Sequence, residues 1–469
     1  MSRTSRSRHR RLAAGLAASA LAITALGSGG SALAAPLDET GPLMNFVVNT
    51  TANNGQVKKT EQAVKAAGGT VVQSWPQIGV VIAQSTNPDF RAAVRAGRNG
   101  RAVQSVGATR TSAVAEGPAS AQSIGDVEAA PVPDPREGEQ WDLAAIKADQ
   151  AHAITDGSRR VLVGVNDSGV DDTHPDLAPN FDAKNSVSCV NNGRPDTTPG
   201  AWRPNSSHGT HVAGTIAAAR NGVGIVGVAP GVRIASVKVV NTSGYIFPEY
   251  SICGFIWAAE HDMDVTNHSY FIDPWEFWCD DNGDQGAVQE SVRRAVAYAT
   301  GKGVLSVAAA GNSNYDLANK TTDSASPNDG IKVTRPINND CLDMPTELPG
   351  VITVASTTRT GQRSGFSNFG RNVIDVAAPG SSILSTMPGG TYALSSGTSM
   401  ASPHVAGVAA LMKSAHPWWG PQELTKALHK QADDTACPTT APDPRCTGST
   451  ANNSFFGEGL VDALDAVKR

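Results

Sequence analysis

The chain has 469 residues, of which 40% are hydrophobic, and its glycines and prolines are spread along the whole length. This size and composition suit one large domain accompanied by a smaller one. The formal net charge is -5, and removal of the first 34 residues, which hold five arginines and no acid, would leave -10. Proteins that bind nucleic acid or an anionic membrane surface are rarely this acidic, so we expect neither partner.

The N-terminus has the pattern of an export signal over residues 1–34. Five arginines precede an apolar run at 12–26, and small residues follow as far as Ala34. We expect cleavage after Ala34 or Ala35 and a secreted, extracellular product. The apolar run is shorter than the roughly 20 residues that cross a bilayer, which disfavours a membrane anchor. Arg10-Arg11 suggests twin-arginine export, but the residues that follow match that signal poorly and favour the general secretory route.

Residues 36–107 are expected to form a small domain of their own, followed by a linker at 108–135. Hydrophobic periodicity predicts four strands and two helices, in the order strand 44–49, helix 56–67, strands 70–75 and 79–84, helix 89–95 and strand 101–106. This β-α-β-β-α-β order is ferredoxin-like. The linker is rich in alanine, serine, glutamate and proline, and we expect it to be exposed and open to proteolysis.

Residues 136–469 alternate short apolar segments with helical ones. Strands are expected at 161–165, 234–240, 304–309 and 351–355, and helices at 251–260 and 289–300. Alternation of this kind predicts an α/β domain with a mostly parallel sheet flanked by helices. In such folds the functional residues lie at strand ends and helix starts.

The chain contains six cysteines, an even number that favours three disulfides in an exported protein. They are Cys189, Cys253, Cys279, Cys341, Cys437 and Cys446. Their spacing matches no zinc motif, and they allow 15 different pairings. A local pair between Cys437 and Cys446 is favoured, because three prolines fold a short loop between them.

Three segments far apart in the sequence each offer one member of a nucleophilic triad. Asp167 ends a strand and precedes a glycine turn, where a carboxylate can hold an imidazole. His208 begins a helix that Ser206 or Ser207 could cap, and can act there as a general base. Ser399 follows a glycine turn at the start of an apolar helix, whose free N–H groups can stabilise an oxyanion. Each residue alone also has an ordinary structural role, but the order Asp, His, Ser predicts a triad.

The segments around these residues are DSGVDDTHPDL, HGTHVAGTI and GTSMASPHVAG. They resemble the three catalytic blocks of the subtilisin-like serine peptidases, and the resemblance runs from Trp141 to Ala466. It implies a secreted serine endopeptidase that cleaves protein or peptide substrates through an acyl-enzyme. By that resemblance Asp167 orients the imidazole, His208 is the general base and Ser399 is the nucleophile. It also implies a monomer that needs no cofactor for its chemistry.

The same resemblance assigns further roles. Asn312, in the segment AAAGNS, corresponds to the asparagine that completes the oxyanion hole together with Ser399. The family has an inhibitory propeptide with the β-α-β-β-α-β plan, which implies a self-processing zymogen inhibited by residues 36–107. The expected substrate-binding residues are Ser269, Tyr270, Phe271, Ala309 and Gly311.

One of these residues departs from the family pattern. Phe271 stands where relatives usually carry a glycine, and we expect its side chain to project into a neighbouring pocket and narrow the cleavage preference. The alternative is that Phe271 turns into the core. The segments 273–284 and 314–349 look like insertions relative to the family, and Cys279 and Cys341 are expected to tie them together.

Two pairs of residues bear on metal binding. His208-x-x-His211 lacks the glutamate and the spacing of H-E-x-x-H, so we expect His211 to pack rather than to bind zinc. The family resemblance places Asp176 and Asn221 at positions that bind a structural calcium. The alternative is that the same sequence forms a glycine-rich turn without metal. The two alternative classes are a non-catalytic binding protein with this fold and a lipase. Ser399 lacks the second glycine of the lipase motif.

Overall fold

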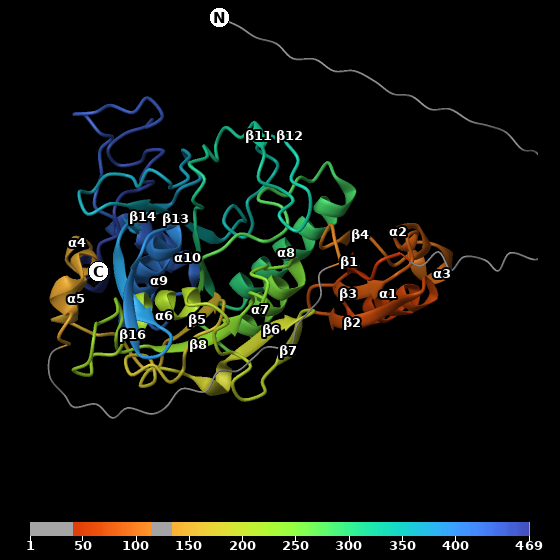
Figure 1. The fold of residues 1–469 in the computed structure, drawn as a ribbon, viewed down its shortest axis with the longest axis horizontal. Helices are drawn as coiled ribbons and strands as arrows, with labels where there is room; N and C mark the ends of the chain where they lie inside the picture. Colours follow the sequence, from red (N-terminus) through yellow and green to blue (C-terminus); the bar gives the residue numbers. More distant parts are fainter. Residues whose placement is uncertain (1–40, 114–133, 469) are drawn as a thin grey trace, which may run out of the picture. The chain divides into compact units, whose positions relative to one another are not determined.

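The computed structural model describes residues 41–113 and 134–468. The expected export signal and most of the expected linker lie outside these ranges. Within them, no helix is both long and apolar enough to cross a membrane. Figure 1 shows the arrangement of the described elements.

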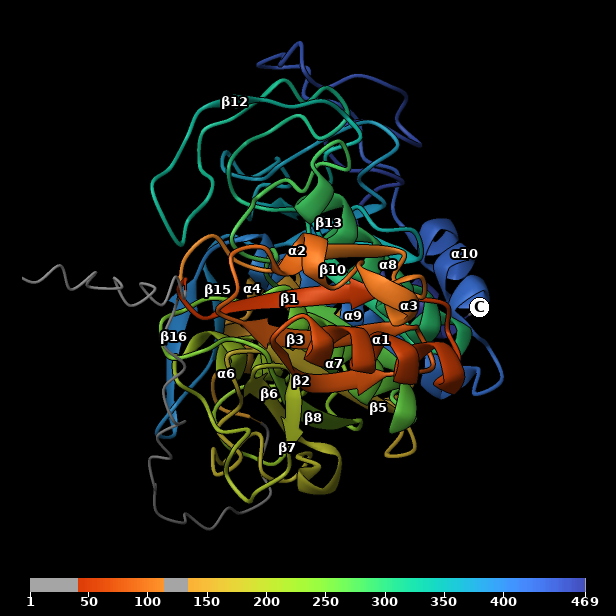
Figure 2. The ribbon, with the colours of Figure 1, turned by 90° about the vertical axis from the view of Figure 1, so that its right-hand side faces the viewer.

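The first part of the chain forms a four-stranded antiparallel sheet in the order β2-β3-β1-β4, which is the predicted ferredoxin-like plan (Figure 2). Its elements are β1 (Met44–Asn49), α1 (Asn54–Ala66), β2 (Gly69–Trp75), β3 (Val80–Ser85), α2 (Phe90–Ala93), α3 (Gly97–Gly100) and β4 (Ser105–Ala108).

Two details differ from the prediction. The helix expected at 89–95 is shortened to α2, and a further short helix, α3, follows it; Gly97, with a positive φ of 72°, separates the two. The last strand begins at Ser105 instead of residue 101, since hydrogen bonds from the N–H groups of Ala102 and Val103 close a turn there.

The two faces of this sheet bury different side chains, as the alternation of a strand requires. Phe46 and Val48 pack with α1 in one apolar cluster. Val47 points the other way and belongs to a second cluster, together with residues of α7 (Pro248–Glu260) and α8 (Gly283–Gly301). The small sheet therefore completes its core against helices of the larger part.

The larger part is built on an eight-stranded sheet in the order β14-β13-β10-β9-β5-β8-β6-β7. All neighbouring strands are parallel except β6 and β7, which confirms the predicted mostly parallel sheet. The strands are β5 (Leu162–Asp167), β6 (Val187–Asn191), β7 (Arg194–Asp196), β8 (Arg233–Lys238), β9 (Val265–His268), β10 (Leu305–Ala309), β13 (Val351–Thr357) and β14 (Val376–Pro379).

Helices cover both faces of this sheet, as buried parallel strands require. Val163 of β5 packs in the cluster of α6 (His208–Ala217) and α9 (Thr398–Ala415), whereas Leu162 packs in the cluster of α7 and α8. Shorter elements complete the fold. These are α4 (Trp141–Ala145), α5 (Ala148–His152), α10 (Pro421–Gln431), α11 (Ala463–Lys468), η1 (Glu137–Glu139), η2 (Ala183–Asn185), β11 (Thr322–Asp323), β12 (Arg335–Pro336), β15 (Ile383–Met387) and β16 (Thr391–Ser395).

All six cysteines form disulfides, which pair Cys189 with Cys253, Cys279 with Cys341 and Cys437 with Cys446. The predicted local pair is confirmed. So is the predicted link between the two insertions, one of which follows β9 while the other precedes β13. This link fixes two irregular segments to each other beside the carboxyl edge of the sheet.

Candidate active site

The carboxyl ends of the parallel strands bring the predicted residues to one edge of the sheet. Asp167 ends β5, Ser269 directly follows β9 and Ala309 ends β10, and β9 lies between the other two strands. His208 and Ser399 begin α6 and α9, two helices that pack against each other. The site is therefore held by the ends of regular elements.

Asp167 and His208 form a hydrogen-bonded pair. Nδ1 of His208 lies 2.8 Å from Oδ1 and 3.0 Å from Oδ2 of Asp167, whose side chain is only 2% exposed. Burial lowers the pKa of His208, but the charge of Asp167 and its hydrogen bond raise it by more, so the net shift is upward. The contact leaves Nε2 as the nitrogen that can take up a proton. The predicted serine cap of α6 is wrong, because Ser207 holds the cap position without a side-chain hydrogen bond.

Ser399 is the second residue of α9, so its N–H is one of the first amides, which have no acceptor within the helix. Its hydroxyl donates to the carbonyl oxygen of Ser269 at 3.2 Å, and the hydroxyl of Ser269 donates back to the carbonyl of Ser399 at 2.9 Å. Among the described residues, no hydrogen bond joins Ser399 to His208. Catalytic contacts of this kind often tighten only when substrate binds.

Thr398 fixes the side chain of Asn312. Oδ1 of Asn312 accepts from the N–H of Thr398 at 2.8 Å and from its hydroxyl at 3.0 Å, which leaves the amide NH₂ free to donate elsewhere. Gly311 precedes Asn312 with a φ of 97°, where a Cβ would meet Nδ2 of Asn368 at 2.4 Å, so only glycine fits. The positioning role of Thr398 was missed, although the residue lies inside the GTSMASPHVAG motif.

A cleft of about 330 Å³ opens beside Ser399 and Asn312. Its lining includes all five predicted substrate-binding residues, which are Ser269, Tyr270, Phe271, Ala309 and Gly311. Tyr270 turns its hydroxyl away to Ser251 and His268. Phe271 is half-buried and belongs to none of the apolar clusters of the described chain, which favours the cleft over the core for its ring.

Three acidic residues of the cleft wall were not predicted, namely Asp273, Glu276 and Asp343. All three lie in the two insertions, which carry no motif. These residues could have been predicted only by knowing how the two loops fold, which no local sequence pattern gives. The position of Asp343 could have been suspected only from its nearness to Cys341.

The other two predicted polar sites are also resolved. His211 is buried, and its Nε2 lies 3.1 Å from the carbonyl oxygen of Ile383, which agrees with the expected packing role. Burial lowers the pKa of His211 to about 4. Asp176 and Asn221 lie on neighbouring loops, since the amide of Asn221 donates to the carbonyl of Pro175 at 3.0 Å.

The loop around Asp176 has features that suit a hard cation. Oδ1 of Asp176 and Oδ2 of Asp134 are buried and have no hydrogen-bond partner in the described part of the chain. A Cβ on Gly224 would lie 2.5 Å from Oδ2 of Asp176, so the loop can close around this carboxylate only with glycine there. Burial raises the pKa of Asp176 to about 6. Asp134, which was counted as part of the linker, was missed. No group of three or more acidic, histidine or cysteine side chains suited to a metal occurs in the described residues.

Comparison with known proteins places this site in a family. The chain belongs to the subtilase family, whose sequence profile matches residues 158–459. It is 36% identical to subtilisin from Bacillus pumilus over 328 residues, 70% of this chain and 98% of that one. Subtilisin NAT from Bacillus subtilis subsp. natto is 33% identical over 328 residues, 70% of this chain and 71% of its own. The protein is accordingly a serine-type endopeptidase that acts on proteins or peptides.

Two solved structures have a similar fold. Fervidolysin from Fervidobacterium pennivorans, described as a keratinolytic enzyme related to subtilisin, matches with a TM-score of 0.65 and 27% identity, covering 92% of this chain and 62% of fervidolysin. The epidermin leader peptide processing serine protease from Staphylococcus aureus has a TM-score of 0.66. It is 21% identical, with 91% and 98% of the two chains covered, and shows likeness of fold alone.

Proposed function

We propose that this protein is a secreted subtilase zymogen in which Ser399, His208 and Asp167 hydrolyse peptide bonds through an acyl-enzyme. His208 takes the proton of the Ser399 hydroxyl as the oxygen attacks the scissile carbonyl, and Asp167 stabilises the imidazolium that forms. His208 then protonates the departing amine. A water molecule, deprotonated by His208, then attacks the ester, and the second intermediate breaks down to release the carboxylic acid product and free Ser399.

The oxyanion of each tetrahedral intermediate accepts two hydrogen bonds in this proposal. One comes from the N–H of Ser399 at the start of α9, and the other from the side-chain amide of Asn312, whose orientation Thr398 holds. Donors that are fixed before the reaction stabilise the charge without reorganising. The Asp167–His208 pair and Ser399, gathered at one sheet edge, carry the assignment.

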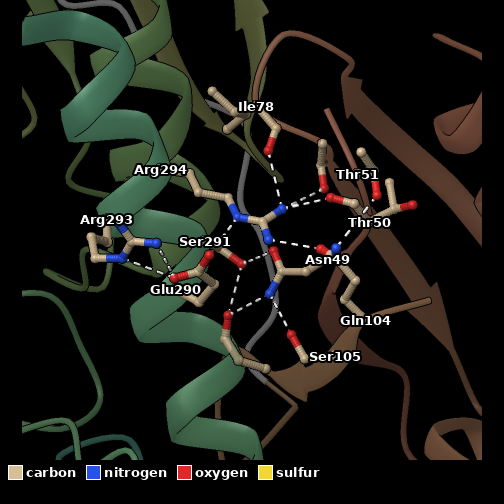
Figure 3. A network of polar contacts seen from close by, with 12 residues as sticks. Asn49, Thr50, Thr51, Ile78, Gln104, Ser105, Glu290, Ser291, Arg293 and Arg294 are labelled. Carbon is tan, nitrogen blue, oxygen red and sulfur yellow. Dashed lines mark hydrogen bonds and ion pairs between the residues drawn. The ribbon is translucent and has the colours of Figure 1, made fainter. Parts of the chain in front are cut away.

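The small sheet is proposed to be the inhibitory propeptide. Besides its shared apolar cluster, it is held by a network of polar contacts with α8 (Figure 3). Arg294 donates to the backbone carbonyl of Thr50 at 2.7 Å and to the side chain of Gln104 at 2.8 Å. Asn49 donates to the carbonyl of Ala287 and accepts from the hydroxyl of Ser291, both at 2.8 Å.

The chain after β4 is fastened as well. Arg110 forms a buried ion pair with Glu249 at the start of α7, and its guanidinium lies 3.9 Å from the ring centroid of Phe247. The N–H of Thr111 then donates a hydrogen bond to the carboxylate of Asp329, and the hydroxyl of Ser112 donates to its backbone carbonyl. The residue before Asp329, Asn328, lines the cleft. These contacts lead the propeptide toward the cleft, and the proposed processing region follows within 108–135. The signal at 1–34 is proposed to direct export of the precursor.

We also propose a structural calcium in the loop of Asp176 and Asn221, with Asp134 as a further ligand. The two unpartnered carboxylate oxygens support this, and such oxygens suit calcium. The ion would add stability and would take no part in the reaction. Phe271 is proposed to narrow one subsite of the cleft.

The substitution Ser399→Ala tests the proposed function. Casein hydrolysis should fall by about 10⁶, the loss that removal of the catalytic serine causes in a subtilisin. Labelling by a fluorophosphonate should disappear, and the purified protein should retain residues 36–135. Ser396→Ala, an exposed serine three residues earlier, is the control and should keep activity and labelling. Normal maturation and hydrolysis by pure Ser399→Ala would refute the assignment.

A further inference from the structure

The wall of the cleft beside Ser399 is acidic. Asp273, Glu276 and Asp343 line it, and no lysine, arginine or histidine is found among the described residues of the lining. All three carboxyl groups are at least nine-tenths buried, so a counter-charge in the cleft would be only weakly screened.

Two of these carboxyl groups already have partners. Asp273 accepts from the N–H of Ile246 and the amide of Asn328, and Glu276 accepts from the hydroxyl of Ser313 at 2.8 Å. Such contacts fix the rim of the cleft. They also occupy acceptor positions on Asp273 and Glu276 that a ligand would otherwise use.

Asp343 differs from them. It is 2% exposed, its Oδ1 has no hydrogen-bond partner among the described residues, and it lines the cleft. Its Oδ2 lies 3.5 Å from the place that a Cβ on Gly311 would occupy, next to Asn312. An unpartnered buried carboxylate is costly, and a charged hydrogen-bond donor is what it lacks.

The residues around Asp343 do not supply that donor. The charge of the buried Lys320 acts on Asp343, but Lys320 forms its ion pair with Glu347. Burial raises the pKa of Asp343 well above its ordinary value, the charges of Glu347 and Glu276 raise it further, and Lys320 only partly opposes them. The disulfide between Cys279 and Cys341 holds the two loops that carry Glu276 and Asp343. The acidic wall is thus built into the fold.

We propose that this cleft selects peptide substrates with an arginine or lysine side chain next to the scissile bond, and that Asp343 is the residue that binds this cation. The inference rests on the proposed function, because it takes the cleft beside Ser399 as the site of cleavage. A guanidinium offers a planar set of N–H donors that matches a carboxylate, and one of these donors would form a hydrogen bond with the unpartnered Oδ1 of Asp343. An uncharged side chain would leave that oxygen without a partner.

Processing of the precursor is not expected to follow this preference. The proposed processing region, 108–135, contains one basic residue, Arg110, and this arginine is held in its buried ion pair with Glu249. A bond in the attached propeptide is presented at a high effective concentration, so a poor side chain can still be cleaved there.

The test compares peptide substrates that differ only at the residue before the scissile bond, which is arginine, lysine, citrulline or phenylalanine. Citrulline has nearly the shape of arginine but no charge. For the mature enzyme, kcat/KM should be highest for arginine and lysine. Asp343→Asn should lower kcat/KM for arginine by about 100-fold, the scale for an unpaired buried charge, and leave citrulline nearly unchanged. Asp340→Asn, an exposed carboxylate on the same loop, should behave as the wild type.

Binding of benzamidine, a small amidinium cation, provides a readout without turnover. Calorimetry should detect it with the wild type and with Asp340→Asn, and not with Asp343→Asn. Equal cleavage after arginine, citrulline and phenylalanine by the wild type would overturn the proposal, and so would an arginine preference that survives in Asp343→Asn. Displacement of benzamidine by calcium would also overturn it, since the wall would then be an ion site. Failure of the proposed function looks different, because no peptide would be cleaved and Ser399 would stay unlabelled while benzamidine still binds.

Discussion

Two regions meet at the cleft, and they are built differently. The proposed catalytic region consists of the ends of regular elements, with Asp167 on β5 and with His208 and Ser399 at the starts of α6 and α9. The facing wall, with Glu276 and Asp343, consists of irregular loops joined by a disulfide. Regular elements hold atoms in fixed relation, which suits bond breaking, whereas loops can vary without disturbing the core.

The difference suggests a division of labour. The catalytic region acts on the peptide bond, which is the same in every substrate. In our proposal the loop wall contacts a substrate side chain, which differs between substrates. Changes in the first region should therefore affect all substrates alike, and changes in the second should affect the ratio between them.

The largest effect on this comparison is expected at Asn312. Asn312→Ala removes one donor to the oxyanion, so kcat should fall by about 10²–10³ with little change in KM, a range known from the equivalent change in a subtilisin. The loss should be the same for every side chain before the scissile bond. Asn319→Ala, an exposed asparagine on the same loop, is the control. An effect of Asn312→Ala that varied with the substrate side chain would break the division of labour.

A smaller effect is expected at the interface of the proposed propeptide, which lies outside both regions. Arg294→Ala removes charged hydrogen bonds to Thr50 and Gln104 that are worth about 1.5–3 kcal/mol together. In the Ser399→Ala precursor, an added protease should then digest residues 41–113 about 10- to 100-fold faster, because cleavage follows local opening.

The adjacent arginine provides the matched control. Among the described residues Arg293 pairs with Glu290 alone (Figure 3), so Arg293→Ala should leave the digestion rate unchanged. Equal rates in the two variants would contradict the proposed role of Arg294. Neither variant should alter kcat/KM of the mature enzyme.

The smallest effect concerns calcium, which should change stability and leave both cleft regions untouched. An ion bound only by the folded protein adds about 2.7 kcal/mol at one hundred times its Kd, so Tm should rise by several degrees. In Asp176→Asn this rise should be lost, whereas Asp149→Asn, an exposed carboxylate on α5, should retain it. A Tm that does not respond to calcium after treatment with a chelator would favour the glycine-rich turn without metal.

The sequence predicted where Asp167, His208 and Ser399 lie in the fold, because they lie within motifs and at the ends of periodic segments. Asp167, His208 and Ser399 were placed at a strand end and two helix starts, and the structure has them there. Local patterns carry such positions, since periodicity identifies the element and a glycine marks its end.

The acidic wall was not predicted, for a physical reason. Asp343 reaches the cleft only because a long irregular segment folds back and is joined to the loop of Glu276 by Cys279 and Cys341. No periodicity describes such a path. The shortened second helix of the proposed propeptide and the missing serine cap of α6 are smaller cases, decided by backbone conformation at single residues.

The most direct test of the division of labour is the ratio of kcat/KM for the arginine peptide to that for the citrulline peptide, measured in the wild type, Asn312→Ala and Asp343→Asn. We predict that Asn312→Ala lowers both values and keeps the wild-type ratio, and that Asp343→Asn lowers only the arginine value and reduces the ratio by about 100-fold. A ratio that changes in Asn312→Ala, or one that stays at the wild-type value in Asp343→Asn, would contradict the account.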